Sequence, residues 1–159
     1  VAAQEGFEAY IVMKIESFDS QNTIFGIGGT AEFLEIQTAD RLRLKIDGDT
    51  DIIDYGTDAF PAGAKIVFML QREEGSTGTY VVRINGVVKD PTAIGGSSNL
   101  ANAGAIDISI LGSRATDRFF DGIIYEVLIY EGDTHSTTQT EQINRYLCNK
   151  HGIVFGSSG

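Results

Sequence analysis

The chain lacks a pair of cysteines and has no tryptophan, two features that often help to build binding sites. Cys148 is its single cysteine, so neither an internal disulfide nor a metal site built from several cysteines can form. Tryptophan is absent. Because sugars are commonly held by stacking on aromatic faces and by amide or carboxylate hydrogen bonds, a glycan site would have to use tyrosine or phenylalanine.

Basic residues and long apolar runs are also scarce. Lysine and arginine together number 12 against 22 aspartates and glutamates, which gives a net charge of −10 at pH 7. Such a charge repels phosphate backbones and anionic membranes, so we expect no nucleic acid partner. No apolar run reaches about 18 residues, so we expect no membrane insertion. A signal-peptide pattern is missing as well.

The sequence does contain alternation of apolar and polar residues with a period of two. "RLRLKI" (41–46) places leucine and isoleucine on one face and Arg41, Arg43 and Lys45 on the other. "AIDISILG" (105–112) alternates in the same way, and "FFDGIIYEVLIYEG" (119–132) carries Ile123, Tyr125, Val127 and Ile129 on one phase. Asn85-Gly86 within "TYVVRINGVV" is a strong hairpin signal. Seven or more such strands predict a β-sandwich.

One segment departs from this pattern and predicts a helix over residues 138–150. Thr138 followed by Glu141 fits a capping box. Ile143, Tyr146 and Leu147 form an i, i+3, i+4 stripe that can lie on the sandwich. Gly152 is placed to end the helix in a left-handed conformation.

Several of these segments, in this order, resemble a known family. "FEAYIVMKI", "TIFGIGG", "RLRLKIDGD", "YVVRINGVV", "ISILGSR" and the closing "INRYLCNKHGI" are similar to the concanavalin A-like, laminin-G-like jelly-roll domains of bacterial or phage type, over residues 6–153. The resemblance implies an all-β, two-sheet antiparallel jelly-roll sandwich with one short C-terminal helix. We expect a single domain over 1–155 and a flexible tail at 156–159. A strand that normally precedes "FEAYIVMKI" is missing, so we expect an upstream domain.

An acidic stretch, "KIDGDTDIIDYGTD" (45–58), raises the question of calcium. Asp47, Asp49 and Asp51 have the first spacings of an EF-hand loop, but Ile52 occupies the position that needs glycine, so that motif fails. Two interpretations remain open. Asp47, Asp49 and Asp51 are metal ligands for calcium on a loop rim, or residues 47–54 are only a solvent-facing turn.

Catalytic patterns are missing. The glucanases of this superfamily use Glu-x-Asp-x-(x)-Glu on one strand, because hydrolysis needs two carboxyl groups at a defined separation. Here "AIDISI" offers a single carboxylate, Asp107, and Glu32 and Glu35 are three residues apart, so they face opposite ways in a strand. His135 and His151 are best explained as solvated or helix-capping side chains. We therefore expect a chain that is not an enzyme.

Candidate ligand-binding residues lie near the variable loops: the aromatic Tyr55, Phe60 and Tyr80, with Asn85, Asn99 and Asn102 as polar partners. Core packing explains Phe60 and Tyr80 equally well. The leading hypothesis is a non-catalytic recognition or structural module of an extracellular or virion assembly, whose partner is a glycan or another protein of that assembly. The alternatives are an accessory carbohydrate-binding domain of a secreted bacterial enzyme and, from another class, a glycoside hydrolase.

Overall fold

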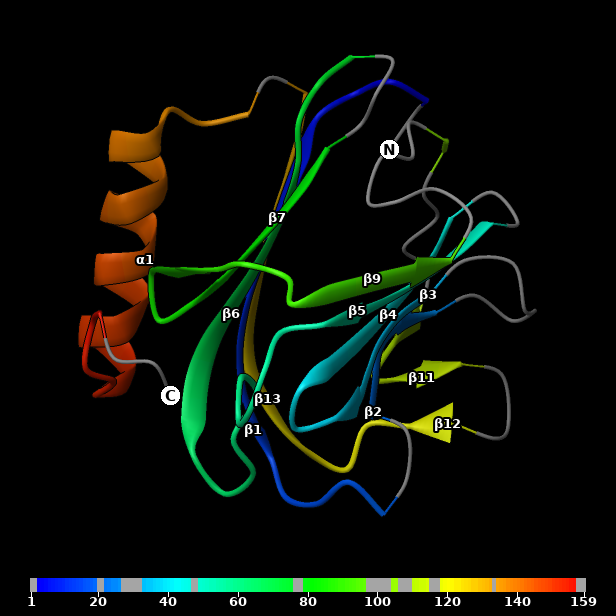
Figure 1. Ribbon diagram of the computed structural model, residues 1–159. Coiled ribbons are helices and arrows are strands. Elements are labelled where there is room, and N and C mark those ends of the chain that lie inside the picture. Colours follow the sequence, from blue (N-terminus) through cyan, green and yellow to red (C-terminus); the bar gives the residue numbers. More distant parts are fainter. Residues whose placement is uncertain are drawn as a thin grey trace.

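Two antiparallel sheets, one of five strands and one of six, face each other, and one helix covers the outer face of the five-stranded sheet (Figure 1). The computed structural model describes residues 3–19, 22–26, 33–46, 49–75, 79–96, 104–105, 110–114, 118–132 and 134–156. This arrangement confirms the all-β, two-sheet antiparallel sandwich with one C-terminal helix. Within the described part of the chain, no helix has the length and apolar content needed to span a bilayer.

The five-stranded sheet has the order β13-β1-β6-β7-β8. These strands are β13 (Gly122–Glu131), β1 (Phe7–Ile15), β6 (Lys65–Arg72), β7 (Tyr80–Ile84) and β8 (Val87–Lys89). The helix α1 (Thr137–His151) packs on its outer side, where Leu147 and Cys148 meet Tyr10, Val12, Val67 and Met69. β1 is therefore buried along both faces, one against the sandwich core and the other against α1.

The six-stranded sheet has the order β10-β2-β3-β4-β5-β9. Its strands are β10 (Ile110–Leu111), β2 (Asn22–Gly26), β3 (Phe33–Thr38), β4 (Arg41–Ile46), β5 (Asp49–Asp54) and β9 (Ala93–Gly96). A separate hairpin, β11 (Ser113–Arg114) with β12 (Arg118–Phe119), lies beside β2. Leu42, Leu44 and Ile46 of β4 are buried in the core and the residues between them are not, which confirms the predicted alternation.

The single phase predicted for β13 is interrupted near its midpoint, so Ile123 and Tyr125 do not share a face with Val127 and Ile129. Val12 of β1 pairs with Glu126 but Met13 pairs with Ile124, so Tyr125 is an extra residue in a β-bulge. A bulge exchanges the two faces of the strand, and Ile124 and Val127 consequently pack against the core together. Ile123, Tyr125 and Ile129 are instead exposed by 46%, 40% and 40%. Of the strand predicted at 105–112, only Ile110–Leu111 is seen, and residues 106–109 lie outside the described part.

The helix begins earlier than its predicted cap. Ser136 is the N-cap, its hydroxyl accepts from the backbone N–H of Gln139, and the Gln139 side chain accepts from Ser136, so the box at Thr138 and Glu141 is wrong. Gly152 ends the helix with φ of 69°, as predicted. Tyr146 is 57% exposed and does not belong to the buried stripe. Residues at i, i+4, i+7 and i+8 face the sheet instead: Thr140, Asn144, Leu147 and Cys148.

Candidate functional site

The aspartates that were predicted to form a turn lie mostly in a strand. Residues 49–54 form β5, which is paired with β4 and β9, so the prediction of a solvent-facing turn over 47–54 is wrong for that part. Asp51 is 2% exposed, because it lies opposite Leu44 on the side of the sheet that faces the core. Asp47 lies outside the described residues. Among the described side chains, no three histidine, cysteine, aspartate or glutamate residues gather as metal ligands, and the calcium site stays a prediction.

The predicted aromatic ligand-binding residues are inside the molecule. Tyr55, Phe60 and Tyr80 are 8%, 0% and 6% exposed. Tyr55 and Phe60 meet edge-to-face with ring centroids 5.8 Å apart, and Tyr80 meets Phe7 at 6.4 Å. Burial raises the pKa of Tyr80 to about 12. Their burial favours core packing, and a ligand-binding role for them stays a prediction.

Of the predicted amide partners, Asn85 lies in the described part of the chain. Asn85 is 2% exposed and sits with Gly86 in the β7–β8 turn at φ of 52° and 86°. Its Oδ1 accepts the N–H of Val67 at 2.9 Å, which ties the hairpin to the sheet. Asn85 O also accepts the N–H of Gly156 at 2.8 Å, where the sequence predicted a tail. Asn99 and Asn102 lie outside the described residues.

One row of residues crosses the face of the six-stranded sheet that points away from the core, and we call it the outer row. Residues opposite each other in paired strands share a face, so the register defines its members. They are Thr23 of β2, Glu35 of β3, Arg43 of β4, Ile52 of β5 and Gly95 of β9. The helix of the described part of the chain, α1, covers the other sheet and does not overlie this row (Figure 1).

The centre of the outer row is a buried carboxylate. Glu35 is fully buried, although it lies on the side of β3 that faces away from the core. Arg118 of the β11–β12 hairpin donates from Nη1 to its Oε2 at 3.1 Å, and Gln37 donates to its Oε1 at 3.2 Å. Removing a carboxylate from water is unfavourable by several kcal/mol unless such partners compensate it. Because core packing requires no ion pair on this side of the sheet, we take Glu35 and Arg118 as candidates for a functional site.

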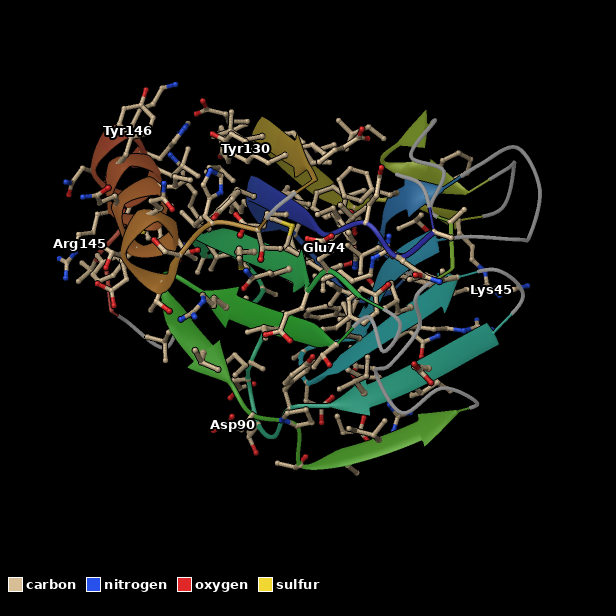
Figure 2. The ribbon with its side chains drawn as sticks, turned by 90° about the horizontal axis from the view of Figure 1, so that it is seen from above. Lys45, Glu74, Asp90, Tyr130, Arg145 and Tyr146 are labelled. Atoms are coloured by element: carbon tan, nitrogen blue, oxygen red, sulfur yellow. The ribbon has the colours of Figure 1, made fainter. Side chains whose placement is uncertain are left out.

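Cationic side chains flank that centre. Arg41, Arg43 and Lys45 alternate along β4 and share the outer side. Arg41 donates to both oxygens of Asp54 at 2.6 and 3.1 Å, which holds the pKa of Asp54 below its usual range. Figure 2 shows Lys45 at the opposite side of the molecule from Arg145 of α1. Ile52, 36% exposed, adds an apolar contact surface between these charges.

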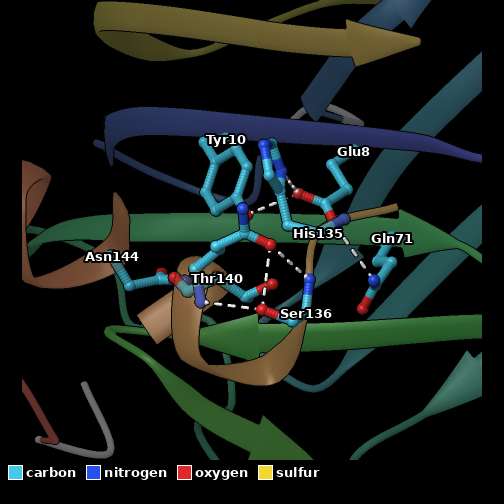
Figure 3. A network of polar contacts seen from close by, with 8 residues as sticks. Glu8, Tyr10, Gln71, His135, Ser136, Thr140 and Asn144 are labelled. Carbon is cyan, nitrogen blue, oxygen red and sulfur yellow. Dashed lines mark hydrogen bonds and ion pairs between the residues drawn. The ribbon is translucent and has the colours of Figure 1, made fainter. Parts of the chain in front are cut away.

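A second polar cluster lies under the helix, and Figure 3 shows it. Glu8 is 1% exposed and accepts hydrogen bonds from Tyr10 at 2.6 Å, from Gln71 at 3.0 Å and from the backbone of His135 at 2.9 Å. The His135 ring also contacts Glu8 at 2.7 Å. Burial and Glu8 raise the pKa of Tyr10. The cluster fixes the segment that leads into α1, so the prediction of a solvated His135 is wrong.

The other histidine is paired as well. His151 Nε2 lies 2.6 Å from Glu126, and Lys150 donates to the same carboxylate at 2.8 Å. These two contacts join the end of α1 to β13 and hold the pKa of Glu126 below its usual range. His151 lies at the helix C-terminus, where the sequence predicted a capping cation. Its contact with Glu126 of β13 also gives it a structural role, because it joins the helix to the sheet.

The sequence carried only part of the signal for the outer row. The alternating cations of β4 are visible in "RLRLKI", and their outward orientation is confirmed. The pairing of Glu35 with Arg118 joins residues 83 positions apart and follows from no local pattern. In the sequence, Glu35 stands out only by its spacing from Glu32, which lies outside the described residues.

Comparison with known proteins shows the fold. The sequence matches no protein-family profile, and no curated protein matches it. Among solved structures, the chain is similar to domain 4 of AbnA, a GH43 extracellular arabinanase from Geobacillus stearothermophilus in complex with arabinotriose, with a TM-score of 0.59 and 20% identity over 91% of this chain and 68% of that one. The receptor binding domain of botulinum neurotoxin type G is more distant, with a TM-score of 0.44 and 15% identity over 90% of this chain and 38% of that one.

Proposed function

We propose that this chain is a non-catalytic recognition module that binds a glycan across the outer row of its six-stranded sheet. The observation that carries the proposal is the buried Glu35, held by Arg118 on a face that needs no ion pair for core packing. Ile52 supplies an apolar surface for sugar C–H groups, and the guanidinium and amide groups around Glu35 supply donors for hydroxyl oxygens.

The likeness in fold to an arabinanase domain in complex with arabinotriose supports a sugar as the ligand. The same likeness favours an extracellular location. It also favours an accessory domain of a secreted enzyme over a structural protein of a virion. Arg41, Ile52 and Arg118 are partly exposed on this face, which offers hydrogen-bond donors and a limited apolar area, as binding sites for polar ligands do.

The same geometry supports binding over hydrolysis. Glycoside hydrolysis needs one carboxyl group that can donate a proton and a second that acts as nucleophile or base. Both oxygens of Glu35 accept hydrogen bonds, from Arg118 and Gln37, and Asp54 is held by Arg41. Arg41 holds the pKa of Asp54 below its usual range, so Asp54 is stabilised in the ionised form and is a poor proton donor.

A pair of matched substitutions tests the site. Ile52→Asp places a charge in the outer row, and Ile129→Asp places one on β13 at similar exposure, 40% against 36%. Titration calorimetry against a panel of neutral and acidic oligosaccharides should find at least one ligand, whose affinity falls about tenfold or more in Ile52→Asp and stays unchanged in Ile129→Asp.

Three results would contradict the proposal. Equal losses in both variants would show that the outer row is not the site. A panel without any ligand would exclude glycan binding and leave a protein partner as the alternative. Release of reducing ends that disappears in Glu35→Gln would overturn the non-catalytic assignment.

A further inference from the structure

All six tyrosines lie in the described part of the chain, and the three exposed ones share one side of the molecule. Tyr125 and Tyr130 of β13 and Tyr146 of α1 are exposed by 40%, 38% and 57%. The others are buried: Tyr10, Tyr55 and Tyr80. Figure 2 shows Tyr130 and Tyr146 on the same side, away from Lys45 of the six-stranded sheet. The exposed tyrosine rings therefore gather on the side that α1 covers, opposite to the outer row.

The β-bulge in β13 turns two neighbouring side chains to that side. Consecutive residues of a regular strand face opposite ways. Here Glu126 pairs with Val12, and Tyr125 is the extra residue. Both contact the end of α1: the ring of Tyr125 lies 6.1 Å from the ring of His151, and the carboxylate of Glu126 lies 2.6 Å from Nε2 of the same histidine. Bulges re-aim side chains beside functional sites, and this one brings an aromatic ring next to a carboxylate.

Tyr146 is linked to the same carboxylate through the helix. Lys150, one turn after Tyr146, donates to Glu126 at 2.8 Å, and its Nζ lies 5.6 Å from the centre of the Tyr146 ring. Nζ of Lys65 lies 4.5 Å from the centre of the Tyr125 ring. Each ring is thus held by a cation while a large part of it stays exposed. Rings that are already fixed lose less side-chain entropy when a ligand binds.

The charges beside these two rings have partners within the chain. They are Lys14 with Glu16, Lys150 and His151 with Glu126, Lys65 with the backbone oxygen of His151, Asp121 with Ser17, and Arg145 with the ring of Phe155. An ionic ligand would have to displace one of these partners, whereas a neutral ligand would not. A second copy of the chain would bring a further charge of −10 and would be repelled.

The apolar surface is also divided by polar groups, which favours a sugar over a protein partner. The centre of a protein–protein interface is depleted of charged residues, but here the Glu126–Lys150 pair lies beside both rings. A sugar presents C–H groups that pack on aromatic faces and hydroxyl groups that hydrogen-bond to charged side chains. Tyr125 and Tyr146 offer the rings, and the ion pair offers the polar contacts.

We infer that the bulge of β13 and the end of α1 form a second glycan surface, the tyrosine site, which takes a neutral oligosaccharide on Tyr125, Tyr146 and the Glu126–Lys150 pair. The tyrosine site lies on the opposite side of the sandwich from the outer row, and it does not rest on the proposed function. A chain with a glycan surface on each side binds a glycan-rich material with higher avidity than either surface alone.

An NMR titration of the aromatic ring signals tests the site, because it detects weak binding residue by residue. The probes are neutral oligosaccharides: arabinotriose, xylohexaose, cellohexaose and mannohexaose. The protein is used as the wild type and as Ile52→Asp, which disables the outer row. We expect at least one probe to shift the ring signals of Tyr125 and Tyr146 in both proteins.

Matched variants locate the contact. Tyr146→Ala should weaken binding of that probe about tenfold or more, and Tyr146→Phe, which keeps the ring, should bind like the wild type. Phe119→Ala removes an equally exposed ring, 55% against 57%, from the β11–β12 hairpin and should leave the affinity of the tyrosine site unchanged when measured in the Ile52→Asp protein. Tyr146 is on the surface, so its variants should keep the melting temperature, which is measured in parallel.

The outcomes keep this inference apart from the proposed function. The tyrosine site is overturned if no probe shifts the two ring signals, or if Tyr146→Ala binds as tightly as the wild type, and neither result touches the outer row. Shifts that vanish in Ile52→Asp overturn it as well, because the probe then binds at the outer row alone. A dimer in sedimentation that Tyr146→Ala dissociates would show that this side is a contact between copies instead.

Discussion

The sharpest structural prediction concerns Glu8, the buried carboxylate under α1. Glu8→Ala would leave Tyr10, Gln71 and His135 without the oxygens that accept their hydrogen bonds. Breaking a buried charged network by removing one partner lowers the free energy of unfolding by about 3–5 kcal/mol. Small domains are stable by only about 5–15 kcal/mol, so this is a large fraction. For a chain of this size, the melting temperature should fall by roughly 6–20 °C.

The matched control is Glu16→Ala. Glu16 also forms an ion pair, with Lys14 at 2.7 Å, but its side chain is 46% exposed, and solvent screening leaves such pairs about 0–1 kcal/mol. Urea unfolding at pH 7 measures both variants, and the midpoint is the readout if the slope is unchanged. A loss below about 1 kcal/mol in Glu8→Ala, or an equal loss in Glu16→Ala, would refute the reasoning that burial makes the Glu8 network strong.

Three further predictions address the pH response, the sheet edge and the cysteine. His151 holds the pKa of Glu126 below its usual value of about 4.3, so this contact stabilises the fold above that pH and the contribution is lost as the pH falls through the lowered pKa. Glu126→Gln should therefore lower the unfolding free energy at pH 7 by about 1 kcal/mol and flatten its dependence below pH 4.5, measured by urea titrations at pH 7, 5 and 3. Gly96→Ala should destabilise more than Gly63→Ala in thermal unfolding, because a Cβ at Gly96 (φ 131°) would overlap the backbone of β5 whereas Gly63 (φ 77°) has nothing within 4 Å; equal losses would contradict this. Cys148 is buried and its pKa is raised by burial, so a thiol reagent should modify it only after unfolding, and rapid reaction of the native protein would show that α1 opens readily.

Local patterns in the sequence determined much of the fold. The alternation in β4 and the Asn85-Gly86 turn depend on interactions between residues close in the chain, and both are seen as predicted. Gly152 ends the helix for the same reason, since only the local backbone conformation matters there. The sandwich class follows from these signals together.

Tertiary pairing decided the features that local patterns did not predict. The bulge at Tyr125 arises from the register between β13 and β1, and it reverses which residues of β13 face the core. Asp51 is buried because it lies opposite Leu44 on the core side of the sheet, although five aspartates in fourteen residues predicted a solvent-facing turn. The Glu35–Arg118 pair exists because a hairpin folds beside β2 and brings distant charges together. Alternation tells which residues share a face of a strand, but only the packing of strands from distant parts of the chain decides what that face meets.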